Sequence, residues 1–122
     1  MYEIKVDPMK KEVYAFAEGF LTMEEATNFI EEFKRKTKNI NSSTYNLIVN
    51  TKDLKTCTPE VAVKMAEILS IYVNIPFKGR YIVKLESVIT QSQVNRVGKT
   101  IPGFSESVVF VKDEREARRL IG

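Results

Sequence analysis

Histidine is absent from this sequence of 122 residues, and cysteine occurs once, at Cys57. Without an imidazole, the chain lacks the side chain that most often serves as a general base. One thiol, no histidine and no carboxylates at EF-hand or zinc spacing argue against a bound metal. No Walker loop or dinucleotide glycine pattern occurs. We therefore expect no enzyme activity, no cofactor and no metal site.

The lone cysteine also excludes a disulfide within the chain. The sequence begins with alternating polar and apolar residues rather than with a secretory leader, so we expect a cytoplasmic protein. The most apolar stretch, residues 61–73, contains Lys64 and Glu67 and is too short to cross a bilayer. We expect no membrane span.

Charge of one sign does not dominate the chain. Nineteen basic and sixteen acidic residues give a net charge of only +3. The richest basic run, residues 34–38, falls in the last turns of a predicted helix, where it complements the helix dipole. A charge run of this kind is typical of a solvated face rather than of a nucleic-acid site. Nucleic acid is therefore not the expected partner.

The size and composition of the chain are those of an ordinary folded domain. Hydrophobic residues make up 43% of the sequence and charged residues 29%. A chain of this length can bury a core without a disulfide or a metal. We expect one domain over residues 1–122.

The first third of the chain predicts a hairpin followed by a helix. Apolar residues alternate over residues 2–6 and resume over 13–17, with a polar turn between them. Thr22 and Glu25 then form a capping-box pattern, with Thr22 at the N-cap and Glu25 three residues later. A helix with one apolar face is predicted to begin at Met23.

The middle of the chain predicts a buried strand and a second helix. Residues 45–49 are mostly apolar, as in a strand covered on both faces. A polar connection leads to Thr58 and Pro59, an N-cap followed by a proline at the first helical position. The apolar residues between there and about residue 73 cover more than one stripe, so this helix should be largely buried or part of an interface.

The last third predicts two further strands, each followed by a helix. A strand at residues 80–85 precedes a short helix at about 91–99, with Thr90 as its expected cap. A strand at 108–111 precedes a helix capped by Asp113. The fold class is therefore α/β, with a mixed, mostly parallel five-stranded sheet, an N-terminal antiparallel hairpin and four helices in the order ββαβαβαβα.

Three segments of the chain resemble the STAS domain, the fold of bacterial anti-sigma factor antagonists. They are the glycine-containing turn at residues 18–21, the Ile-Pro-Gly-Phe loop at 101–104, and the final strand and helix with an early alanine at Ala117. The resemblance covers the whole chain in order and spacing. It implies a bacterial type of regulatory module that binds another protein.

The loop that carries the phosphorylation switch in that family has a different sequence in this chain. Asn50 stands where the family has an aspartate, and no glycine follows the hydroxyl residue. Thr58, before Pro59, comes nearest to the phosphoacceptor position. A phosphothreonine would be favoured at a helix start, but a threonine before a proline is also an ordinary cap. A switch like that of the family is therefore not expected.

The sequence leads to one main functional hypothesis and one alternative. The first is a non-enzymatic interaction module of STAS-like fold that binds a regulatory or structural protein. Its surface would be the loop before the second helix together with the exposed side of that helix, with Asp53, Thr56, Cys57, Thr58 and Glu60 as the contact residues. The alternative is a small-ligand or lipid-binding domain with an apolar pocket beside that helix. The breadth of its apolar surface leaves a homodimer open.

Overall fold

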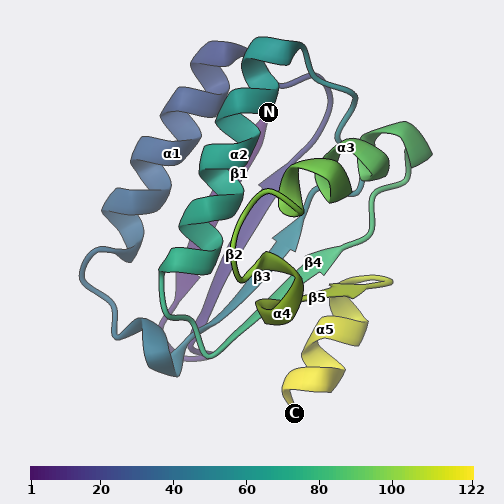
Figure 1. The fold of residues 1–122 in the computed structure, drawn as a ribbon. Coiled ribbons are helices and arrows are strands. Elements are labelled where there is room, and N and C mark those ends of the chain that lie inside the picture. The colour runs from purple at the N-terminus through teal and green to yellow at the C-terminus, as the bar shows by residue number, and fades with distance from the viewer.

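The computed structural model describes all of residues 1–122 and consists of a five-stranded sheet with helices packed on both faces (Figure 1). The strands are β1 (Tyr2–Asp7), β2 (Glu12–Ala17), β3 (Asn46–Asn50), β4 (Gly79–Val83) and β5 (Val108–Val111). The helices are α1 (Met23–Thr37), the 3-10 helix η1 (Ser42–Thr44), α2 (Pro59–Asn74), α3 (Val88–Gly98), α4 (Phe104–Ser107) and α5 (Glu114–Ile121).

The strands lie in the sheet in the order in which they occur in the sequence, β1-β2-β3-β4-β5. The first pair is antiparallel, and all later pairs are parallel. This confirms the mixed, mostly parallel sheet that the sequence predicts. Each crossover moves one strand along in the same direction, so right-handed connections place α1, α2, α3 and α4 on one face.

The structure adds the short helix α4 to the four helices that the sequence predicts. The sequence predicts the third helix at about residues 91–99. Beyond that helix, the left-handed φ of 84° at Gly103 starts a new turn. Phe104 then lies so close to Gly98 that a Cβ on that glycine would be 2.5 Å from the Phe104 ring. Both glycines are therefore needed to fold α4 back onto α3.

Helix α3 begins three residues earlier than the sequence suggests. Its cap is Ser87, whose hydroxyl accepts a hydrogen bond of 3.1 Å from the Thr90 amide. Thr90 is therefore not the cap. Its side chain is fully buried, and its hydroxyl has no hydrogen-bond partner. The helix starts with Val88 and Ile89, which are apolar but exposed. Prediction from the spacing of apolar residues assumes that such residues are buried, so it misses this first turn.

The main core lies between the sheet and the helices α1 to α4. It consists of 18 buried residues, centred on the inward-facing side chains of β2, β3 and β4 and on the aromatic residues of α1 and α2. On the opposite face, only α5 covers the sheet, over β3, β4 and β5. Four buried residues form this second, smaller core: Ile48, Val83, Val111 and Ala117.

Arg80 of β4 holds the C-terminal end of α2. Its guanidinium donates hydrogen bonds of 2.5 Å to the Tyr72 carbonyl, 3.1 Å to the Val73 carbonyl and 2.7 Å to the Ile75 carbonyl. Helix ends leave such carbonyls unpaired, and α2 has no basic residue in its last turn. Arg80 supplies the missing cation. Burial lowers its pKa.

Replacing Arg80 should destabilise the protein markedly. We expect Arg80→Met to lower the free energy of unfolding by about 2 kcal/mol, because three carbonyls lose charged donors. Arg80→Lys should lose less, since one ammonium still faces the helix end. Urea unfolding followed by circular dichroism measures both values. The matched control is Arg96→Met, at an exposed position with no ion pair, and a loss for Arg80→Met no larger than that of the control would contradict the role given to Arg80.

Candidate functional site

Three loops are joined at the carboxyl end of the parallel strands. The Gly19 amide donates to the Asp53 carbonyl at 3.1 Å, and the Lys55 amide donates to the Gly19 carbonyl at 2.9 Å. The Glu86 amide donates to the Lys52 carbonyl at 2.8 Å. The loop after β3 is therefore fixed on both sides, by the segment after β2 and by the segment after β4.

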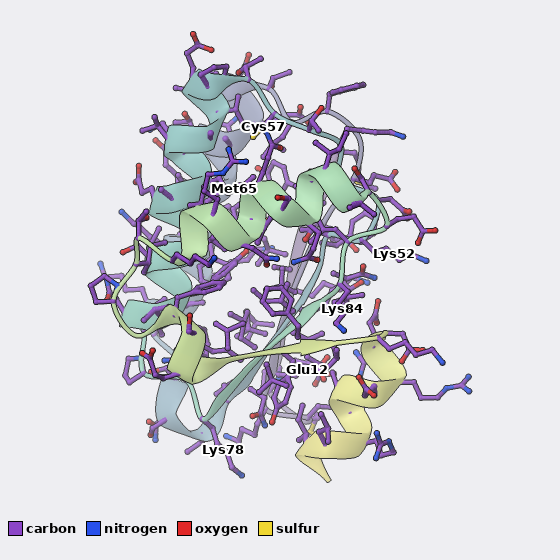
Figure 2. All side chains as sticks on the ribbon, turned by 45° about the vertical axis from the view of Figure 1, so that its right-hand side comes forward. Glu12, Lys52, Cys57, Met65, Lys78 and Lys84 are labelled. Carbon is purple, nitrogen blue, oxygen red and sulfur yellow. The ribbon has the colours of Figure 1, made fainter.

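A groove of about 660 Å³ lies on these joined loops. Lys52 stands at this end of the sheet, and Lys78, just before β4, lies at the opposite end (Figure 2). The groove has mixed walls, with both charged and apolar side chains. Its lining residues are Met1, Glu18, Gly19, Phe20, Lys52, Asp53, Leu54, Lys55, Glu86 and Ser87.

The structure distributes the predicted contact residues over this end of the molecule. Asp53 lines the groove and is exposed. Thr56, Thr58 and Glu60 are also exposed but lie outside the groove lining, along the approach to α2 and its first turn. Thr58 is the cap of α2, and its hydroxyl accepts a hydrogen bond of 3.4 Å from the Val61 amide. The sequence-based prediction of this cap is confirmed.

Cys57 faces inward and is half-buried. Its amide donates to the Gln93 side-chain oxygen at 3.4 Å, which joins the loop to α3. Burial raises the pKa of the thiol above its usual value. A reactive cysteine requires a lowered pKa, so the environment of Cys57 does not activate it as a nucleophile.

Several exposed apolar side chains lie at the same end of the sheet as the groove. Phe20, which lines it, is 70% exposed, and Val88, which follows the lining residue Ser87, is 83% exposed. Six of the nine large apolar side chains that are exposed lie at this end, at chain or helix starts or in the loop before α1: Met1, Phe20, Met23, Val63, Val88 and Ile89. We call these six residues the apolar end. Sequence reasoning missed it because its members come from four separate segments.

An apolar cavity of about 60 Å³ lies beneath α2, between the helix and the sheet. Cys57 and Met65, two of its lining residues, lie beside α3 in Figure 2. Fourteen of the sixteen lining residues are hydrophobic. They are Ala15, Ala17, Leu21, Phe29, Val49, Thr51, Leu54, Lys55, Cys57, Val61, Met65, Ile68, Leu69, Tyr72, Ile82 and Val94.

Two small residues of β2 account for the open space. Ala15 and Ala17 point toward the helices and are almost fully buried, at positions where larger side chains would fill the interior. Both contribute to the sequence pattern only as apolar members of a strand. The strand pattern therefore predicts which way they face but not the space that they leave.

A polar network on the other face of the sheet ties α5 to the strands. The Glu114 carboxylate accepts hydrogen bonds of 2.8 Å from the Tyr14 hydroxyl and 2.6 Å from the Asn50 amide. Arg118 donates to Glu114 at 3.2 Å and to Glu12 at 2.9 Å. Glu12 lies beside α5 in Figure 2. Asn50 is therefore occupied in holding α5.

The network shifts the ionisation of its members. Burial, together with the hydrogen bond to Glu114, raises the pKa of Tyr14 to about 12. Burial also acts to raise the pKa of Glu114, but hydrogen bonds from Tyr14, Asn50 and Arg118 outweigh it and leave that pKa below its usual value. The neutral phenol and the ionised carboxylate are thus the forms that fit the fold.

The structure shows neither a cluster of metal ligands nor a membrane-spanning helix. No group of three or more histidine, cysteine, aspartate or glutamate side chains comes together as a metal site would require. None of the helices combines the length and the apolar character of a bilayer span.

The sheet order, the single-sided helical layer and the C-terminal helix on the opposite face define a STAS-like fold, also called SpoIIAA-like. A solved structure with this fold is an uncharacterized protein of the DUF3478 family from Shewanella loihica PV-4. It superposes with a TM-score of 0.70 at 15% sequence identity, over 99% of this chain and 94% of that one. No protein-family model and no curated protein sequence matches the chain.

The stability of the protein should fall at alkaline pH because of Tyr14. Its pKa is raised in the fold, so its contribution is complete below the ordinary value of about 10 and is lost as the pH rises to about 12. In Tyr14→Phe, the urea midpoint should decline less over this range than in the wild type. Urea midpoints at about pH 9.5 and about pH 11.5 test this, and parallel declines in both proteins would refute it.

Proposed function

We propose that residues 1–122 act as one non-enzymatic, STAS-like interaction module that binds another protein through the carboxyl end of the sheet. The observation that carries the proposal is the apolar end. Isolated apolar residues on a surface need no explanation, but six gathered at one end of a small chain are typical of a binding surface. The STAS-like fold supports the same conclusion.

The chemistry of this end suits a protein partner. Phe20 is aromatic and exposed, and aromatic side chains frequently anchor the centre of an interface. Asp53 and Thr56 in the loop and Glu60 in the first turn of α2 supply an exposed polar rim at the same end of the molecule. Thr58 contributes through the cap of α2, and Cys57 through its inward packing, so neither is expected to dominate the contact.

The backbone of this surface is well fixed for binding. The hydrogen bonds between the three loops hold Gly19, Lys52, Asp53, Lys55 and Glu86 in one arrangement. A surface that is ordered before binding loses less conformational entropy when the partner arrives. We therefore expect the loop after β3 to keep its shape in the complex.

Charged residues placed in the apolar end should weaken partner binding. We expect Phe20→Asp and Val88→Asp each to weaken the complex at least tenfold, since a central apolar contact contributes about 2 kcal/mol or more. Partners cross-linked in the native cell extract would be identified first, and their affinities for purified variants measured next. Unfolding midpoints of both variants should stay near that of the wild type, because both side chains are exposed.

The matched control is Met9→Asp, which changes an equally apolar residue that is 93% exposed in the turn between β1 and β2. This turn lies at the opposite end of the sheet. Equal binding by Met9→Asp and loss in the other two variants supports the proposal. Loss in all three, or in none, contradicts it. Sedimentation of the wild type and of Phe20→Asp tests a second copy of the chain as the occupant.

The cavity beneath α2 favours a second candidate function, the binding of a small apolar ligand. Apolar cavities of this kind stay dry and take up apolar atoms or molecules. We expect xenon and isobutene to shift the methyl resonances of Val49, Leu69 and Ile82, all of which line the cavity. Ala15→Ile, which fills the space, should lose these shifts. Absence of shifts in the wild type at saturating probe would refute this candidate.

A further inference from the structure

Strand β5 forms one of the two edges of the sheet and lies in front of the other strands in Figure 2. On the side of β4, the Val111 carbonyl accepts a hydrogen bond of 2.8 Å from the Lys84 amide. Backbone groups of successive strand residues point to alternate sides, so Val109 also faces β4, and Phe110 directs its amide and carbonyl outward. The outer edge of β5 therefore presents backbone groups that are free to pair with another strand.

The opposite edge of the sheet, β1, is protected against such pairing. It carries the exposed side chains of Glu3 and Lys5, whose charged atoms lie 3.5 Å apart. The Lys36 ammonium donates a hydrogen bond of 2.7 Å to the carbonyl of Ile4 in the same strand. Charged side chains on an edge strand, lysine above all, commonly prevent the addition of a further strand. β5, with the sequence VVFV, has neither a charge nor a proline to serve this purpose.

Two exposed apolar side chains lie beside the edge of β5. Val109 is 46% exposed, and Leu120 of α5 is 48% exposed. Glu114 and Arg118 turn one flank of α5 toward β2, so Leu120, on the opposite flank of the helix, lies toward β5. Apart from Met9, these two are the only large apolar residues that are exposed outside the apolar end. They form a second apolar surface, which we call the β5 edge surface.

We propose that the β5 edge surface is a contact between two copies of the chain. The two β5 strands pair antiparallel about a two-fold axis and join the two sheets into one. A two-fold axis places the same surface against itself, so an uncharged edge meets an equally uncharged edge. Val109 and Leu120 of each copy are then covered by the other copy, and the outward amide and carbonyl of Phe110 gain backbone partners.

The charges at the two ends of β5 fit the antiparallel direction. Glu106 precedes the strand and Lys112 follows it, and both side chains are exposed. Neither takes part in an ion pair within the chain. Antiparallel pairing brings each lysine to the end of the strand where the other copy has its glutamate. Parallel pairing would instead bring like charges together, which is unfavourable.

The length of β5 sets the strength of this contact. The strand has four residues, so the interface is small, and we expect a weak dimer whose amount depends on protein concentration. The contact differs from the dimer through α2 that the sequence leaves open. It is also separate from the apolar end, so partner binding there does not require it.

The first test is sedimentation velocity of the wild type from about 10 μM to about 1 mM, over which a reversible dimer should appear. We expect Val109→Lys to raise the dissociation constant about tenfold or more, because it places a charge in the contact. The matched control is Val63→Lys, at a valine of α2 that is 69% exposed, and it should leave the dimer unchanged. Urea midpoints at the lowest concentration should stay near that of the wild type in both variants. A wild type that is monomeric throughout, or equal weakening by both variants, overturns the proposal.

A charge exchange tests the direction of pairing. Glu106→Lys and Lys112→Glu should each weaken the dimer about threefold, whereas the double variant should regain the wild-type dissociation constant, since both pairs re-form with their charges reversed. Hydrogen exchange of the Phe110 amide should also slow as the dimer forms. A double variant that dimerises no better than either single variant, or Phe110 exchange that is independent of concentration, overturns antiparallel pairing through β5.

Discussion

The order of the strands is the constraint on which the rest of the structure depends. Because β2 to β5 follow one another in a single direction, every right-handed crossover returns over the same face of the sheet. The sheet has no point at which the strand order reverses, and therefore none of the crevice that binds ligands in doubly wound folds. Places that remain for a site include the loops at the carboxyl end and the inside of the one-sided helical layer. The groove and the cavity occupy these two places.

Helix α2 is held unequally at its two ends, and both proposed sites adjoin its more weakly held end. Its last carbonyls accept three hydrogen bonds from the Arg80 guanidinium, whereas its side-chain cap is one bond of 3.4 Å from the Val61 amide to Thr58. The apolar end includes Val63, on the outer side of the first turns of α2, and the cavity includes Val61, on the inner side.

Local patterns in the sequence predict most of the fold. Thr58 and Pro59 marked the start of α2 and Asp113 marked the start of α5, because caps are recognised within three or four residues. Ser87 was overlooked because the first residues of α3 are apolar but exposed. The candidate site is much harder to predict from the sequence. The loop with the expected contact residues lies at the carboxyl end of the sheet, where its role in binding stays a prediction. The space left by Ala15 and Ala17 and the partners of Asn50 depend on residues distant in the chain.

The network beneath α5 also has a consequence for the order of assembly. Tyr14 contacts a residue 100 positions later, and Glu12 contacts one 106 positions later. During synthesis, β2 leaves the ribosome long before its partners in α5 exist, so the outer side of the sheet stays exposed to water until α5 has been made. Contacts of such long sequence separation slow folding, since a large loop must close before they form. Helix α5, which is eight residues long, thus covers the outer side of a sheet whose strands are already paired.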